Sequence, residues 1–278
     1  MANSFNEFFT RMPAEIVNEI PPIDPENTPD FAKYFFKNRE DESDTPLFSF
    51  SNTPITPQEI VDDTKKLQPK LSQDMNGLSL HFLMNIIDVI SLPLVHIFSC
   101  SLNNGYVPLQ LKIAKVIPIF KSGDRQIMDN YRPISLLSNF SKILEKIVSF
   151  RLTSFLDHNS LISRFQFGFR KAHSTLHPLI LFMNKITESL NNKSFTLSIF
   201  CDLRKAFDTV DHQILFKKFF KLGIRGVELE WFKSYLSDRQ QYVIINGLPS
   251  TLLHILLGVP QGSILGPLLF LIYINDLP

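Results

Sequence analysis

The stretch that most constrains the fold covers residues 197–212, where an apolar run ends in acidic side chains. Leu197 and Ile199 belong to that run and predict a short buried strand, with Asp202 at its C-terminal end. A carboxylate at the point where a buried strand reaches the surface can hold a divalent cation, because hard cations take oxygen ligands. Asp202 or Asp208 could equally cap the helix that follows. These residues alone leave both interpretations open.

Composition indicates a globular chain with a basic middle. The 278 residues suffice for one large domain or two modest ones, and 26 phenylalanines predict large cores filled with aromatic rings. Residues 1–70 carry 7 basic and 13 acidic side chains, whereas residues 112–171 carry 11 basic and 4 acidic ones. The basic segment would suit a phosphate-rich partner. Charge alone still favours an ordinary solvated surface.

Cysteine usage and hydropathy suggest an intracellular protein. Cys100 and Cys201 lie in apolar surroundings without metal-ligand spacing, which predicts buried free thiols in a reducing compartment. We expect no stretch to approach the roughly 20 apolar residues of a membrane span. The longest, 264–274, is interrupted by a Gly-Pro pair. The N-terminus lacks a signal-peptide layout, so we expect a nuclear or cytoplasmic location and no membrane partner.

Apolar periodicity predicts a mixed α and β chain. Residues 21–54 are rich in proline and acidic side chains and predict a linker with a short helical insert at 30–38. Thr56 is expected to cap a helix, and Pro93 to kink or divide another. Trp231 is expected in the core. The expected helices cover residues 3–12, 56–67, 80–102, 139–157, 175–190, 214–222, 227–236 and 264–274, and the expected strands 114–120, 131–137, 241–245 and 252–257.

The strands at 114–120 and 131–137 predict a hairpin-like pair with a basic connecting loop. Pro118 and Pro133 place these strands at sheet edges, since proline cannot donate to a strand ladder. His173 and His177 have helical spacing in a later loop and helix start, but neither a third ligand nor a glutamate base accompanies them, which argues against zinc.

A glycine-containing loop at 258–263 permits close backbone approach to a bound molecule. This loop, the Asp202 stretch and the basic hairpin occur in an order that resembles the reverse transcriptase domain of non-LTR (LINE-type, jockey-like) retrotransposons. A group II intron type maturase fits the strings less well. The matching strings are Lys115–Asp124, Asn130–Ser138, Gln166–Thr175, Asp202–His212, Trp231–Val243, Gly258–Ser263 and Ile274–Pro278.

The resemblance implies an α+β fold with the fingers and partial palm of a right-hand polymerase. It divides the chain into an acidic flexible region at 1–55, a mostly helical N-terminal extension at 56–111, fingers at 112–195 and a truncated palm at 196–278. It also implies an RNA-directed DNA polymerase that uses an RNA template, a DNA primer and dNTPs.

The resemblance also assigns roles around the first acidic motif. Asp202 matches the first catalytic, metal-binding carboxylate, and Leu203 matches the position whose backbone carbonyl also reaches metal. The implied cofactor is Mg²⁺, since phosphoryl transfer uses two cations to stabilise the attacking and leaving oxygens. Phe207 matches the bulky residue beneath the sugar of the nucleotide. Asp208 is expected to have a structural role.

The remaining assigned residues are expected to contact the nucleotide. Lys121 and Arg132 match fingers residues that hold the triphosphate, where cations neutralise phosphate charge. Arg170 matches a basic fingers residue near the template or nucleotide; a surface ion pair is the alternative for these arginines. Gln261 and Gly262 match the loop that packs on the nucleotide and template.

One departure from the family pattern bears on activity. The second palm motif contains Asp-Asp, and the only such pair here is Asp62-Asp63, far from the expected place. We therefore expect this chain by itself not to polymerise. The alternative is a non-catalytic nucleic-acid-binding remnant or a pseudogene fragment.

Overall fold

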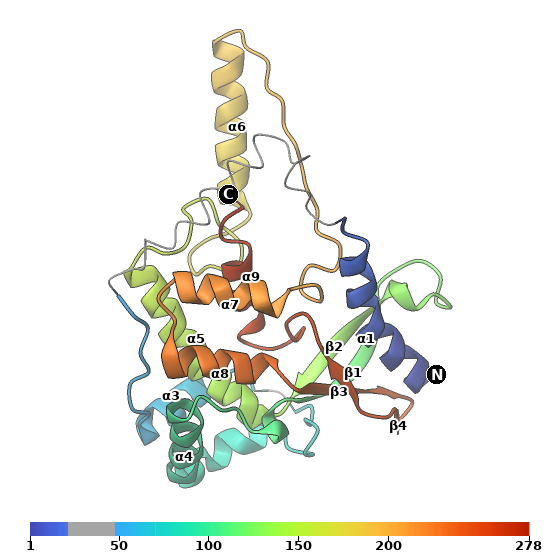
Figure 1. Ribbon diagram of the computed structural model, residues 1–278, viewed down its shortest axis with the longest axis vertical. Coiled ribbons are helices and arrows are strands. Elements are labelled where there is room, and N and C mark those ends of the chain that lie inside the picture. Colours follow the sequence, from blue (N-terminus) through green and yellow to red (C-terminus); the bar gives the residue numbers. More distant parts are fainter. Residues whose placement is uncertain (22–47, 70, 278) are drawn as a thin grey trace.

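The computed structural model describes residues 1–21, 48–69 and 71–277. The helical insert expected at 30–38 and most of the expected linker therefore lie outside the described residues. The described part is an α+β protein, as predicted, with a helical body, a small sheet at one side and one helix that projects from the body (Figure 1). The helices are α1 (Ala2–Asn18), α3 (Pro57–Lys65), α4 (Leu80–Asn103), α5 (Asn139–His158), α6 (Leu176–Asn191), α7 (His212–Lys221), α8 (Gly226–Leu236) and α9 (Gly266–Tyr273).

The sheet joins segments far apart in the sequence. Its strands are β1 (Ile113–Phe120), β2 (Tyr131–Leu137), β3 (Arg239–Ile245), β4 (Leu248–Pro249) and β5 (Leu253–Ile255). They follow the order β2-β1-β3-β4, with β5 also paired to β3. β1 runs antiparallel to β2 and parallel to β3. The β1–β3 pairing stops at Val116, so Pro118 lies in the part of β1 that pairs with β2 alone, which fits its expected place at an edge.

Helix α1 lies across the sheet beside β1 and β3 (Figure 1). Phe5 and Phe9 are buried in one cluster with Val116 of β1 and Val243 of β3. The Asn6 amide donates to the main-chain oxygens of β3 and the β4–β5 connection. The helix continues well beyond the 3–12 expected, because its second half carries further apolar side chains onto the same face.

The main core is built by α3, α5, α7, α8 and α9 with part of α4. Trp231 is 1% exposed and its indole nitrogen donates to Ser101 Oγ at 3.0 Å, which confirms its predicted core position. Thr56 caps α3 as predicted, accepting from the Glu59 N–H at 3.1 Å. The Glu59 carboxylate then pairs with Arg151 of α5 at 2.7 Å, which fixes α3 against α5.

Helix α4 runs unbroken through Pro93, so the proline does not divide it. By length and composition alone α4 could cross a membrane. Its most apolar stretch of 18 residues has a mean hydropathy of 1.8, and 28% of that stretch is buried within the protein. It is the one such helix among the described residues, and the prediction that no stretch is apolar enough is therefore wrong. Core helices pass the same test, and α4 packs on α3, α5 and α8, so the finding is weak evidence for a span.

The segment before Asp202 differs most from prediction. Residues 195–203 form no strand, and Leu197 and Phe200 are 89% and 82% exposed. A buried strand needs neighbours for its backbone N–H and C=O groups, and no described strand pairs with this segment. Helix α6 precedes this segment and projects from the body (Figure 1). None of its residues is buried. Cys201 is accordingly exposed, as is Cys100 on α4, so the prediction of buried thiols is wrong.

Candidate functional site

The loop Gly258–Ser263 is the place where several distant segments meet. Gly258 N–H donates to Val210 O and Val259 N–H to Phe207 O, both at 2.8 Å. On its other side, Gln261 O accepts from the Ser135 N–H of β2 at 2.9 Å. The loop therefore connects the segment after Asp202 with the basic hairpin.

Two glycines allow these close approaches. Gly258 has φ +82°, and a Cβ there would lie 2.6 Å from Asp208 O. Gly262 has φ +110°, and a Cβ there would lie 2.7 Å from Ser135 O. Because both neighbours are backbone atoms, neither could move aside for a side chain. The glycines are thus required by the packing of the loop itself.

Asp208 and Gln261 form the side-chain contact at the centre of the loop. Gln261 Nε2 donates to both carboxylate oxygens of Asp208, at 2.7 and 2.8 Å. Burial raises the pKa of Asp208, since the charged form loses hydration, and the hydrogen bond from Gln261 and the charge of Lys205 oppose this only in part. The structural role expected for Asp208 is consistent with this contact.

Phe207 connects the loop region to two other elements. Its ring stacks on Phe270 of α9, with centroids 4.7 Å apart, and meets the edge of Phe169 at 5.7 Å. These contacts bring together the segment after Asp202, α9 and the loop that contains Phe169. The predicted sugar-contacting ring is thus held from two sides beside the Gly258–Ser263 loop.

Glu145 of α5 holds the C-terminal end of the loop. Its carboxylate is 1% exposed and accepts from the Ile264 N–H at 2.7 Å and from the Tyr235 hydroxyl at 3.0 Å. Ser141 Oγ also donates to it, at 3.2 Å. Burial raises the pKa of Glu145 despite these donors and the charge of Arg239. Sequence reasoning missed Glu145; the available signal was a carboxylate flanking the apolar stripe of α5.

Lys121 and Arg132 lie on the basic hairpin. Lys121 follows β1 and its N–H donates to Asn130 O at 2.8 Å, which closes the β1–β2 connection. Arg132 lies in β2 opposite Ile119 of β1. Both residues are exposed, and neither side chain forms an ion pair with any residue that the structure describes. Both side chains lie on the same hairpin and are therefore available to bind an anionic ligand.

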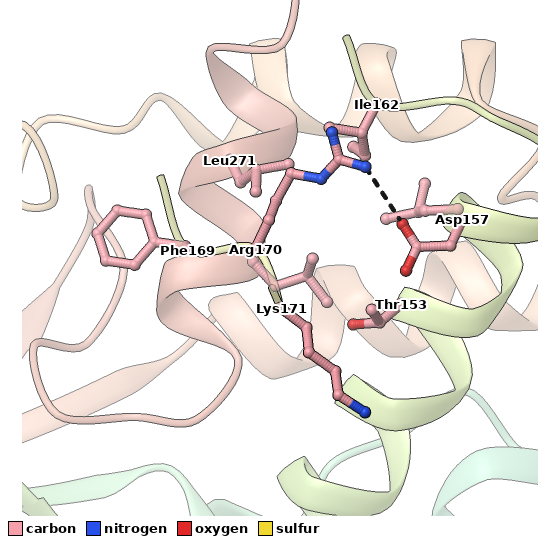
Figure 2. A pocket seen from close by; sticks show the side chains of 9 residues that line it. Thr153, Asp157, Ile162, Phe169, Arg170, Lys171 and Leu271 are labelled. Carbon is pink, nitrogen blue, oxygen red and sulfur yellow. Dashed lines mark ion pairs between the residues drawn. The ribbon is translucent and has the colours of Figure 1, made fainter. Parts of the chain in front are cut away.

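Arg170 is engaged within the protein. Its guanidinium points towards Asp157 of α5, with Nη2 3.7 Å from Oδ1, beside a cavity of about 70 Å³ lined also by Phe169 and Lys171 (Figure 2). Its Nη1 donates to Ser163 O at 3.2 Å. These contacts correspond to the ion-pair alternative, and a nucleotide contact by Arg170 stays a prediction.

Asp202 and Leu203 are exposed and lie in irregular chain. Within residues 1–21, 48–69 and 71–277, no group of three or more His, Cys, Asp or Glu side chains could hold a metal ion. The described residues therefore do not fit a two-metal site. A single exposed carboxylate cannot provide one, since Mg²⁺ requires several ordered oxygen ligands.

Comparison with known proteins agrees with this arrangement of motifs. Residues 119–278 match the family described as reverse transcriptase (RNA-dependent DNA polymerase). The chain is 35% identical to the probable RNA-directed DNA polymerase from transposon BS of Drosophila melanogaster, over 86% of the chain and 26% of that protein. It is 38% identical to the RNA-directed DNA polymerase from mobile element jockey of the same species, over 66% of the chain and 20% of that protein.

A third relative is the jockey polymerase of Drosophila funebris, at 35% identity over 81% of the chain and 25% of that protein. The chain thus spans between a fifth and about a quarter of the length of these relatives. The family match covers the end of β1, the β1–β2 connection and β2, the segment after Asp202 and the Gly258–Ser263 loop. The chain therefore belongs to the reverse transcriptase family, and the relatives it resembles are polymerases of non-LTR mobile elements.

Proposed function

We propose that this chain supplies the fingers and the N-terminal part of the palm of an RNA-directed DNA polymerase from a mobile element. Its substrates are an RNA template, a DNA primer and dNTPs. The observation that carries the proposal is the Gly258–Ser263 loop, which is fixed against Phe207, Asp208 and Ser135 by backbone and side-chain hydrogen bonds. A rigid loop of this kind can orient a nucleotide without reorganising when it binds.

The residues around the loop have complementary tasks in this proposal. Phe207 packs beneath the sugar, and Gln261 and Gly262 contact the nucleotide. Lys121 and Arg132 neutralise the triphosphate from the hairpin, where charge-assisted hydrogen bonds to phosphate are strong. Sequence is read by base pairing, so the protein needs only to fit the duplex and hold its backbone.

The proposal includes a limit on activity. Mg²⁺ would stabilise the charge that develops in nucleotidyl transfer, but the described residues contain no group of three or more side chains that could hold a metal ion. We therefore propose that residues 1–278, assayed by themselves, do not extend a primer. The proposed location is the nucleus or cytoplasm.

Primer extension by purified residues 1–278, with and without magnesium, tests this limit. The expected result is no extension with a primed RNA template. Robust magnesium-dependent extension that is abolished by Asp202→Ala would show that the chain is catalytically complete, and would overturn the proposed limit.

Binding of nucleic acid without chemistry is the second candidate, favoured by the exposed side chains of Lys121 and Arg132. RNA affinity should then fall with salt, and Lys121→Ala with Arg132→Ala should weaken binding and reduce the salt slope by about 0.7 for each lost phosphate contact on a single strand. Asp202→Ala should have no effect. Lys217→Ala, at an exposed lysine of α7, is the matched control. Equal losses in the control would indicate non-specific attraction.

A further inference from the structure

The carboxamide of Gln261 is held in a single orientation. Its Nε2 lies 2.7 and 2.8 Å from the two oxygens of Asp208. An ionised carboxylate only accepts hydrogen bonds, so the NH₂ group of Gln261 must face it and Oε1 must face the other way. The pair therefore determines which end of the amide is turned away from Asp208.

Asp208 cannot follow the amide if it moves, because its own backbone is fixed. Its N–H donates to Lys205 O at 2.8 Å, and its carbonyl lies against Gly258. The neighbouring carbonyls of Phe207 and Val210 accept from the loop that carries Gln261. Backbone hydrogen bonds on both sides of Asp208 thus make it a rigid support.

We propose that Asp208 is a positioning residue that turns Gln261 Oε1 towards the nucleotide as a hydrogen-bond acceptor. The matching group on the ligand is then a donor, a hydroxyl or an amino group. This inference rests on the proposed function, which gives Gln261 its contact with the nucleotide. Without Asp208 the amide rotates freely, so binding must order it and half of its orientations present the wrong end.

Binding of dTTP to the full chain, loaded with a primed RNA template that offers adenine, tests the inference. Asp208→Ala should weaken dTTP binding roughly 5- to 10-fold, the cost of ordering one free side chain. Gln261→Ala should weaken it at least as much. In the double variant the loss from Asp208→Ala should disappear, since Asp208 acts through Gln261.

A spectroscopic readout separates positioning from a general loss of stability. In the ¹⁵N-labelled chain, the Gln261 side-chain NH₂ signal should be shifted and slow to exchange, and Asp208→Ala should return it to the position of a free amide. Asp208→Asn should restore much of the signal and the affinity, because the Asn oxygen can accept from Nε2. The matched control is Asp211→Ala, which removes the N-cap of α7 but has no contact with Gln261. It should lower stability and leave both readouts unchanged.

The outcomes are distinguishable. Tight dTTP binding by Asp208→Ala, or losses that add in full in the double variant, would overturn the inference and leave the proposed function intact. Failure of the wild-type chain to bind dTTP would overturn the nucleotide role of Gln261, and the inference would fall with it. If Asp211→Ala weakened dTTP binding as much as Asp208→Ala does, the effect would be one of stability alone, and the inference would be overturned.

Discussion

Glu145 illustrates how much one buried carboxylate can hold in place. Its oxygens accept from two hydroxyls and from the backbone at the start of α9, so removing it leaves donors unsatisfied in the core. Glu145→Ala should lower the free energy of unfolding by about 1–3 kcal/mol. Glu145→Gln should cost less, because its oxygen can accept from the backbone while its NH₂ faces the hydroxyl oxygens of Tyr235 and Ser141. Urea denaturation of both variants measures the difference.

The raised pKa of Glu145 also predicts a pH dependence. In the unfolded chain the group ionises near its ordinary value of 4.5, whereas the folded protein keeps the proton to higher pH. Stability from this group is therefore present below pH 4.5 and is lost as pH rises through the folded pKa. Asp208 acts in the same direction. The Glu145→Gln protein should lose less stability over this range than wild type, and an equal decline in both would contradict the assignment.

At the scale of elements, the Gly258–Ser263 loop allows the energetic cost of close packing to be separated from the cost of backbone strain. Gly258→Ala places a Cβ against Asp208 O and should cost the strain of positive φ, roughly 1–2 kcal/mol, plus about 1–3 kcal/mol of overpacking. Gly247→Ala is the matched control, because φ is +79° but no atom lies within 4 Å. It should cost the strain alone. Thermal unfolding compares the two, and equal losses would show that the loop has room.

The elements that could be predicted from the sequence are those that are stabilised by residues close to them in the chain. Helix α5 matches its apolar periodicity within one residue at its C-terminal end, and the Thr56 cap forms as expected. The strand expected before Asp202 does not form. An apolar run becomes a strand only where another strand pairs with it, and the sequence pattern does not show whether such a partner exists. Asp208 and Gln261 were identified as residues, but their contact spans 53 positions and no local rule indicates it.

At the scale of the whole molecule, stability is distributed unevenly. Helix α6 has no buried residue and residues 195–203 are exposed, whereas α5 and α8 lie in the main core. Amide hydrogen exchange should therefore be fast throughout α6 and 195–203 and slowest in α5 and α8. Protection of α6 equal to that of α5 would show that its apolar side chains are covered in solution, for example by self-association.

The connections of the Gly258–Ser263 loop also have a consequence for the order of folding. The hydrogen bonds that hold it join residues 53 and 119 positions apart in the chain. Closing such long segments is slow compared with helix formation, which is local. A refolding chain should regain its helical circular dichroism before the Gln261 amide reaches its final environment. The Gly258–Ser263 loop, where we propose that the nucleotide binds, would then be the last part of this molecule to mature.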